Sequence, residues 1–319
     1  MRKILSIFLI ALVSLSLSAC EESEDNGQVK VVTTLFPQYD IVRSLAGDKV
    51  DLSLTLPPSV SAHSYEPTPS SVIDLLESDL FIYSSDALEP WVHDVLSDHE
   101  EGDLVVLNLS MYVALIDGAS EHIHEGEEED HSHEEIEYDP HYWSDPLNVK
   151  LMVNVIAREL ELLLPSEVES IRANRDLYLE ELDHLHEEFL HLEEHRATDY
   201  MMHGGHNAVG YFVDRYDYIY VNPYQGFSTD AEPTPSAIAN MIDLMTEHNI
   251  EYLFSEKLIS DTVANTIREQ TTAEILYLYA GGNLSKEEFD GGLTFLEMME
   301  HNLEQYKIGF GYDEENHQH

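Results

Sequence analysis

The stretch 165–196, PSEVESIRANRDLYLEELDHLHEEFLHLEEHR, sets the organisation of the chain. Five of its apolar residues recur at spacings of four, three, four and three: Tyr178, Leu182, Leu185, Phe189 and Leu192. Because an α-helix turns once in about 3.6 residues, these side chains lie on one face of a single helix, roughly 45 Å long at about 1.5 Å per residue. A helix of this length predicts a rigid connector between two parts of the molecule.

Strand-like apolar runs alternate with helical segments on both sides of this helix. Before it, the runs are VKVVTTL (29–35), VDLSLTL (50–56), DLFIYSS (79–85) and DLVVLNL (103–109). After it, they are DYMMH (199–203), YIYVN (218–222), IEYLFS (250–255) and AEILYLY (273–279). The alternation predicts an α/β fold of two similar lobes with parallel sheets, joined by the long helix. Ligands of such sheets bind outside the carboxyl ends of the strands, so we expect a site in the interlobe cleft.

A short repeat supports the similarity of the two lobes. The sequence EPTPS occurs at 66–70 and again at 232–236. In each half it opens a helical segment that leads into an apolar strand. The matching position indicates a shared architecture.

The first twenty residues have the features of a secretory signal. Arg2 and Lys3 precede an apolar stretch, and LSAC at 17–20 resembles the lipobox of bacterial lipoproteins, in which Cys20 would carry the lipid. Cys20 is the only cysteine, so an internal disulfide is excluded. We divide the chain into a signal peptide (1–20), a tether (21–28), an N-terminal lobe (29–164), the connecting helix (165–196), a C-terminal lobe (197–311) and a tail (312–319).

The chain is strongly acidic. Removal of Arg2 and Lys3 with the signal takes the formal net charge from −48 to −50. This charge excludes a nucleic-acid partner and disfavours contact with an anionic membrane except through lipid. With 24% charged and 43% hydrophobic residues, the composition is still that of a globular protein.

The run 121–135, EHIHEGEEEDHSHEE, combines four histidines with eight carboxylates. Imidazole is a preferred ligand of Zn(II), Cu(II) and Ni(II), so the run indicates metal binding. It is too polar and too acidic to form a core, and we interpret it as a loop of weak accessory metal ligands. These ligands are His122, His124, His131 and His133.

Three other histidines fall where the predicted lobes meet. His63 follows the second strand, His141 lies in DPHYWSDP, and His206 follows the fifth strand in MMHGGHNAVGY. Three neutral imidazoles would form an N₃ set for Zn(II) with one position left over. Asp139 and Asp145, on either side of His141, are candidates to orient its other ring nitrogen.

These motifs make the chain similar to a known family. HSYEPTP (63–69), DPHYWSDP (139–146) and HNAVGYFVDRY (206–216) resemble, in order and spacing, the ligand motifs of the solute-binding lipoproteins that serve ABC importers of zinc and manganese. The segments 31–50 and 295–306 also resemble this family, so the similarity covers nearly all of the mature chain. The resemblance implies two lobes bridged by a long helix, a metal between them, and delivery to an ABC permease and its ATPase.

Carried over motif by motif, the resemblance gives His63, His141 and His206 as the metal ligands. A histidine at the third position and a His-rich loop before DPH are typical of the zinc branch. Many members supply a carboxylate as fourth ligand from the loop after the last strand, but here that loop is YAGGN (279–283), without an acid. The fourth ligand is therefore water, a histidine of the loop, or Glu256. His203 is an alternative to His206 in the third motif, although the HNAVGY match favours His206.

The expected function is that of an extracytoplasmic, high-affinity zinc-binding protein that delivers Zn(II) to an ABC permease. We expect a monomer without enzymatic activity, lipid-anchored at Cys20 to the outer face of the cell membrane or periplasmic. Because imidazole must be deprotonated to bind metal, we also expect affinity to fall below about pH 6.5.

Three alternatives are open from the sequence. The protein could be a manganese-binding member of the same family, or a metal-buffering or adhesive lipoprotein that uses 121–135 as its main site. A metallohydrolase is the third, because His191-Leu-Glu-Glu-His195 fits the pattern H-x-x-E-H. A helix rich in Glu and His produces this pattern by chance, and no third ligand accompanies it.

Overall fold

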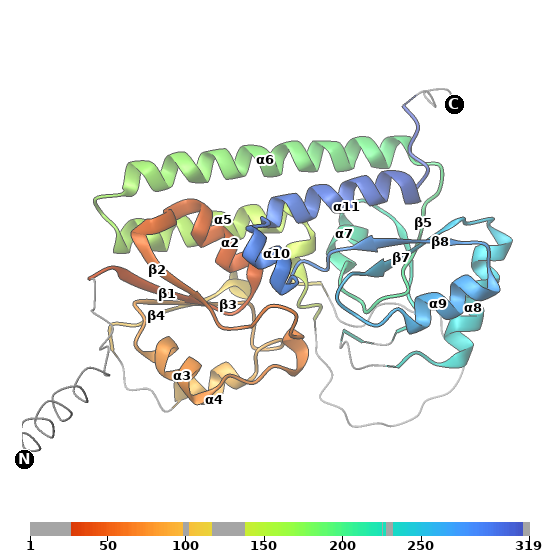
Figure 1. Cartoon of the computed structure of the whole chain (residues 1–319). Coiled ribbons are helices and arrows are strands. Elements are labelled where there is room, and N and C mark those ends of the chain that lie inside the picture. Colours follow the sequence, from red (N-terminus) through yellow and green to blue (C-terminus); the bar gives the residue numbers. More distant parts are fainter. Residues whose placement is uncertain (1–26, 98–101, 117–137, 225, 228–231, 315–319) are drawn as a thin grey trace, which may run out of the picture.

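The computed structural model describes residues 27–97, 102–116, 138–224, 226–227 and 232–314. Cys20 and the run 121–135, with its four histidines, lie outside these described residues. Figure 1 shows two α/β lobes side by side, with one long helix running along both. None of the described helices is long and apolar enough to cross a membrane.

The N-terminal lobe is built on a parallel sheet of four strands in the order β2-β1-β3-β4. The strands are β1 (Val29–Thr33), β2 (Val50–Leu54), β3 (Leu80–Tyr83) and β4 (Val105–Asn108). The helices are α2 (Phe36–Ala46), α3 (Pro69–Leu76), α4 (Trp91–Ser97) and α5 (Pro146–Leu163). Alternate residues of β1 and β3 face opposite layers: Val31 and Ile82 join the core with α2 and α5, whereas Val32 and Phe81 pack with α3 and α4.

The C-terminal lobe repeats this topology. Strands β5 (Tyr200–Met202) and β6 (Ile219–Val221) pair in parallel, as do β7 (Tyr252–Glu256) and β8 (Glu274–Leu278). A parallel bridge between His203 and Phe254 joins the two pairs, which gives the order β6-β5-β7-β8. The helices are α7 (Gly210–Arg215), α8 (Pro235–Glu247), α9 (Thr262–Gln270), α10 (Lys286–Gly291) and α11 (Phe295–Gly309). All eight predicted strand runs are thus confirmed.

Helix α6 (Val168–His195) is the predicted connector, about 42 Å long at 1.5 Å per residue. It packs on α5 and α2 in the first lobe and on α11 farther along, and Figure 1 shows it over both lobes. Its apolar face is buried as predicted, and on this face Phe189 packs against aromatic side chains of the second lobe. The Phe189 ring centroid lies 5.1 Å from that of Phe212, 5.3 Å from that of Tyr216 and 6.2 Å from that of Tyr306.

The repeated EPTPS has one structural role in both lobes. Thr68 and Thr234 are the N-caps of α3 and α8, and the hydroxyl of each accepts a hydrogen bond of 3.2 Å from a backbone N–H three residues on. The following prolines, Pro69 and Pro235, occupy the first helical turn, where a missing N–H costs nothing. Each helix follows the second strand of its lobe.

The segment after β8 returns to the first lobe, which the strand and helix patterns did not predict. The backbone N–H of Phe36 donates to Gly282 O at 3.2 Å, and that of Ser59 donates to Leu284 O at 2.9 Å. The Asn283 amide also donates to Pro57 O at 2.9 Å and to Val60 O at 2.7 Å. The two lobes are therefore bound together close to the loop that carries His63.

Candidate metal centre

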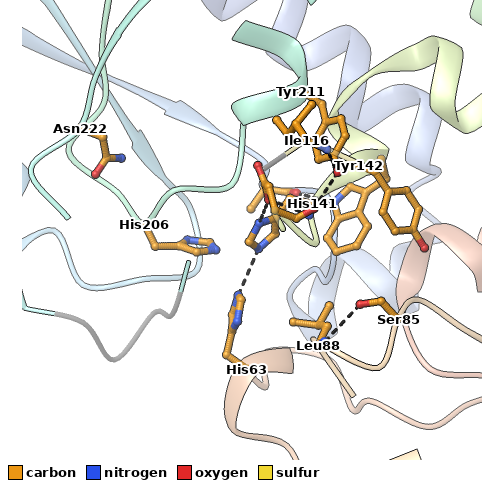
Figure 2. A network of polar contacts seen from close by, with 12 residues as sticks. His63, Ser85, Leu88, Ile116, His141, Tyr142, His206, Tyr211 and Asn222 are labelled. Atoms are coloured by element: carbon orange, nitrogen blue, oxygen red, sulfur yellow. Dashed lines mark hydrogen bonds and ion pairs between the residues drawn. The ribbon is translucent and has the colours of Figure 1, made fainter. Parts of the chain in front are cut away.

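The three histidines of the sequence motifs lie in turns and loops, where the lobes face each other. His63 lies in a 3₁₀ turn, Ala62–Ser64, after β2. His141 precedes the 3₁₀ turn Tyr142–Ser144, and His206 lies in the loop between β5 and α7. Figure 2 shows the three rings converging, His63 and His141 from one lobe and His206 from the other.

The rings form a nearly equilateral triangle. Their centroids are 5.1 Å apart for His63 and His141, 5.2 Å for His141 and His206, and 5.4 Å for His63 and His206. One ring nitrogen from each lies within 4.8 Å of the other two, and the Nε2 atoms of His63 and His141 are 3.1 Å apart. Among the described residues, no other His, Cys, Asp or Glu side chains form such a group of three or more.

Carboxylates bind the outer nitrogens of two of these rings. Asp139 Oδ1 accepts from the backbone N–H of His141 at 2.9 Å and from its Nδ1 at 2.8 Å. Glu256 Oε1, at the end of β7, accepts from Nδ1 of His206 at 2.7 Å. With the proton on Nδ1, each Nε2 keeps a lone pair for a metal. The prediction that Asp139 orients His141 is confirmed.

The corresponding prediction for Asp145 is wrong. Asp145 Oδ1 accepts from the Leu147 N–H at 2.9 Å and so caps α5, while Oδ2 accepts from Arg215 at 2.9 Å and 2.6 Å. Arg215 belongs to α7, so this carboxylate pairs with the second lobe and does not hold the ring of His141. Two aspartates that flank one histidine therefore differ in role, because the chain turns between them.

His203, the alternative to His206, is buried outside the triangle. Its Nδ1 lies 3.0 Å from the Tyr220 hydroxyl, and its Nε2 lies 4.0 Å from Glu256 Oε1. The histidines of the H-x-x-E-H pattern lie at the end of α6, where His195 Nδ1 donates to His191 O at 2.6 Å and His191 Nδ1 contacts the Tyr312 hydroxyl at 2.8 Å. None of these three histidines, His203, His191 or His195, belongs to a group of three possible ligands among the described residues.

Burial shifts the protonation equilibria of the site. It lowers the pKa of His63 to about 2, assisted by His141 and His206, and lowers that of His141 well below its usual value. Burial raises the pKa of the Asp139 carboxyl to about 7. For Glu256, burial raises the pKa, but the proximity and hydrogen bond of His206 outweigh it and hold the pKa below its ordinary value. His63 and His141 are thus neutral, as metal ligands must be.

A cavity of about 290 Å³ adjoins the triangle and is bounded by all three histidines and Glu256. Its other walls are the loop that carries His63, the segment after β7 and the segment after β8. Sequence reasoning predicted a site in a cleft between the lobes but not the size of this cavity. It also missed the contact of Glu256 with His206, whose only signal was a carboxylate at the carboxyl end of a strand.

A family model described as "Zinc-uptake complex component A periplasmic" matches residues 31–309. The chain belongs to this zinc-uptake family. Family members are binding components rather than enzymes, which agrees with the prediction of no enzymatic activity. The high-affinity zinc uptake system protein ZnuA of Bacillus subtilis (strain 168) is 31% identical over 308 residues, which cover 94% of this chain and 96% of that protein.

Other members of the zinc-uptake family extend the comparison. The zinc-binding lipoprotein AdcA of Streptococcus pneumoniae (strain ATCC BAA-255 / R6) is 27% identical over 96% of this chain, which spans 61% of AdcA's length. Among solved structures, the metal-dependent lipoprotein YcdH of Bacillus subtilis has a TM-score of 0.75 at 28% identity, covering 89% of this chain and 99% of that one. The Zn(II)-bound ZnuA-like domain of Streptococcus pneumoniae AdcA has a TM-score of 0.74 at 24% identity with the same coverage. The predicted fold and family are confirmed.

The position of Glu256 leads to a prediction that separates two roles. If Glu256 orients His206, Glu256→Leu lowers zinc affinity by about 10- to 100-fold, whereas Glu256→Gln keeps the hydrogen bond and stays within about tenfold of wild type. If Glu256 is instead a ligand, both variants lose far more. Zinc affinity is measured by competition with a chromophoric chelator, and Glu251→Gln, at an exposed position before β7, is the matched control.

Proposed function

We propose that this chain captures Zn(II) outside the cytoplasm and delivers it to the permease of an ABC importer, with His63, His141 and His206 as its ligands. The observation that carries the proposal is the triangle of imidazoles between the lobes, two of them oriented by carboxylates. Membership of the zinc-uptake family and the zinc-binding names of the relatives ZnuA and AdcA support it.

The donor set accounts for the choice of metal. Imidazole nitrogen suits Zn(II), whereas Mn(II), Mg(II) and Ca(II) prefer oxygen ligands. Three neutral rings leave the charge of the cation uncompensated. The carboxylates of Asp139 and Glu256, which are hydrogen-bonded to Nδ1 of His141 and His206, supply negative charge close to the metal. The Zn(II) ion is cargo, so it must also leave, and a fourth position open to the cavity allows exchange.

The finer points of localisation are part of the same proposal. Lipid at Cys20 would anchor a monomer to the membrane, with 21–28 as the tether. The weak ligands His122, His124, His131 and His133 would collect zinc for the three-histidine site. A cargo-binding protein held close to its permease by a lipid meets it at high effective concentration.

The test is a titration of the mature protein with zinc and manganese in competition, repeated on a variant lacking 121–135. We expect one tight zinc site in both proteins, several weaker sites only in the full chain, and a preference of at least about a hundredfold for zinc over manganese. A preference for manganese would overturn the proposed cargo. Loss of the tight site on deletion would instead make 121–135 the main site.

Burial of the rings changes the pH dependence that the sequence predicts. Between pH 7.5 and 5.5, an imidazole with the ordinary pKa loses about tenfold of its neutral fraction, so three such ligands would lose about a thousandfold in zinc affinity. Because the pKa values of His63 and His141 are lowered, both rings stay neutral at pH 5.5 and do not compete for protons. We expect zinc affinity to fall by far less than about a thousandfold over this range, and protonation of Asp139, whose pKa burial raises to about 7, to contribute to the fall. Competition titrations at the two pH values check this, and a thousandfold fall would contradict it.

A further inference from the structure

The cavity beside the triangle is far larger than the open position of a metal requires. A single bound water needs about 10–15 Å³ of such space, whereas this cavity has about 290 Å³. That volume approaches the lower limit of small-molecule sites, about 300 Å³. Because His63, His141 and His206 all line it, a molecule in the cavity could contact a metal held by the three rings.

The described residues that line the cavity are unusual for this chain because they are nearly free of acid. Asp and Glu make up 63 of 319 residues, so about four would be expected among the nineteen lining residues. Only Glu256 is acidic, and its carboxylate is bound to His206. The cavity is also lined by a cationic side chain, that of Lys257, although Lys and Arg together number only 15 in the whole chain. Lys257 is thus the only cation among the nineteen lining residues, and a carboxylate in the cavity could pair with it.

Lys257 is held in place by its neighbours. Its Nζ donates to the Tyr279 hydroxyl at 2.6 Å, lies 4.0 Å from the centroid of that ring, and is 3.6 Å from Glu288 Oε1. Its side chain is 32% exposed, and Lys257 is one of the residues that line the cavity. A positioned ammonium of this kind can bind a carboxylate by charge-assisted hydrogen bonds.

The rest of the cavity is a preformed mixture of apolar and polar surface. Leu88, Ile259 and Leu278 provide apolar walls, and Ser260 and Asn283 provide polar groups. The wall at Ser59 is fixed in a left-handed conformation, φ 68°, by the bond from its N–H to Leu284 O and by the Asn283 bridges to the same turn. A rigid cavity of this kind needs little reorganisation to bind a ligand.

We propose that this cavity binds a small carboxylate chelator, such as a hydroxy acid or an amino acid, which supplies the fourth ligand of the zinc. One carboxylate would coordinate the metal and offset its charge, a second polar group would meet Lys257, and the carbon chain would lie against the apolar wall. The inference rests on the proposed function, since it requires zinc on the three histidines. It deepens that function, because the cargo is then a zinc complex with an organic anion.

The test is equilibrium dialysis of radiolabelled citrate and, separately, L-histidine against the mature protein with and without one equivalent of zinc. Acetate, which has one carboxylate and little bulk, is the comparison ligand. We expect one citrate or histidine per zinc-loaded chain, binding at least about tenfold weaker without zinc, and acetate binding at least about tenfold weaker than the better chelator. The arm that binds identifies the class of chelator.

Two variants connect the binding to the cavity. Lys257→Met removes the cation and Ile259→Trp fills the space, and each is expected to weaken chelator binding at least about tenfold while the protein still takes up one zinc. Lys286→Met, on exposed α10, is the matched control and should bind like wild type.

Zinc uptake is measured in every sample, so failure of the proposed function is seen separately as loss of the single tight zinc site. If zinc binds and neither chelator does, or if Lys257→Met and Ile259→Trp bind chelator as wild type does, the chelator site is overturned. Binding that appears only after deletion of 121–135 overturns it as well, because the chain's own histidines then fill the position.

Discussion

Replacing His141 with alanine is expected to lower the zinc affinity of the mature protein by about a thousandfold or more. The variant loses one of three proposed ligands. Asp139 also loses the imidazole ring to which it is hydrogen-bonded, so its carboxylate no longer orients a ligand. Tight zinc binding is worth about 10–16 kcal/mol at protein sites, so one ligand of three is worth about 4 kcal/mol, which corresponds to about a thousandfold. His63→Ala and His206→Ala are expected to have effects of similar size.

The measurement is competition against a zinc-selective chromophoric chelator, with circular dichroism of the zinc-free proteins as a check of folding. His93→Ala, at an exposed position on α4, is the matched control and should bind zinc like wild type. If His141→Ala retained the tight site, the triangle would not be where zinc is held. The metal would then have to bind elsewhere in the chain, for example at 121–135.

Replacing Phe189 with alanine is expected to destabilise the zinc-free protein by about 3–5 kcal/mol. The Phe189 ring is 2% exposed and packs against Phe212, Tyr216 and Tyr306, so alanine leaves a cavity where α6 meets the second lobe. The free energy of unfolding is measured by urea denaturation. Leu190→Ala, the next residue on the same helix and 38% exposed, is the control and should change stability by less than about 1 kcal/mol.

The same pair of variants tests whether α6 fixes the cleft. Phe189→Ala should also lower zinc affinity, because His206 and the other two ligands come from lobes that α6 holds in register. Equal stability of Phe189→Ala and Leu190→Ala would mean that α6 is not fastened to the second lobe through this ring. Reduced stability with unchanged zinc affinity would assign the fixing of the cleft to the other interlobe contacts, such as the pair of Asp145 and Arg215.

Local patterns were sufficient to predict the elements of the fold. The two-residue and 3.6-residue periods predicted all eight strands and the face of α6, because burial of apolar side chains leaves a direct record in their spacing. The EPTPS repeat predicted two helix starts, since Thr and Pro act there through the backbone of the next few residues. The motifs around His63, His141 and His206 predicted three side chains that the structure brings together.

Contacts between distant segments were decided by the tertiary structure alone. Glu256 reaches His206 across 50 residues, and Asn283 reaches Pro57 across 226. Asp139 and Asp145 have the same residue type beside the same histidine, yet only Asp139 binds its ring, because the 3₁₀ turn between them directs Asp145 to α5 and Arg215. The lowered pKa of His63 and the cavity beside it likewise depend on which walls close around the ring.

The sequence by itself determined the two α/β lobes, the helix that joins them and the three histidines. Each of these follows from side chains that lie close together along the chain or repeat with a fixed period. The tertiary structure decided which carboxylates hold the rings, how far burial lowers the pKa values of His63 and His141, and that a cavity with one lysine adjoins them. These properties depend on the three-dimensional path of the chain around the rings, which leaves no periodic pattern in the sequence.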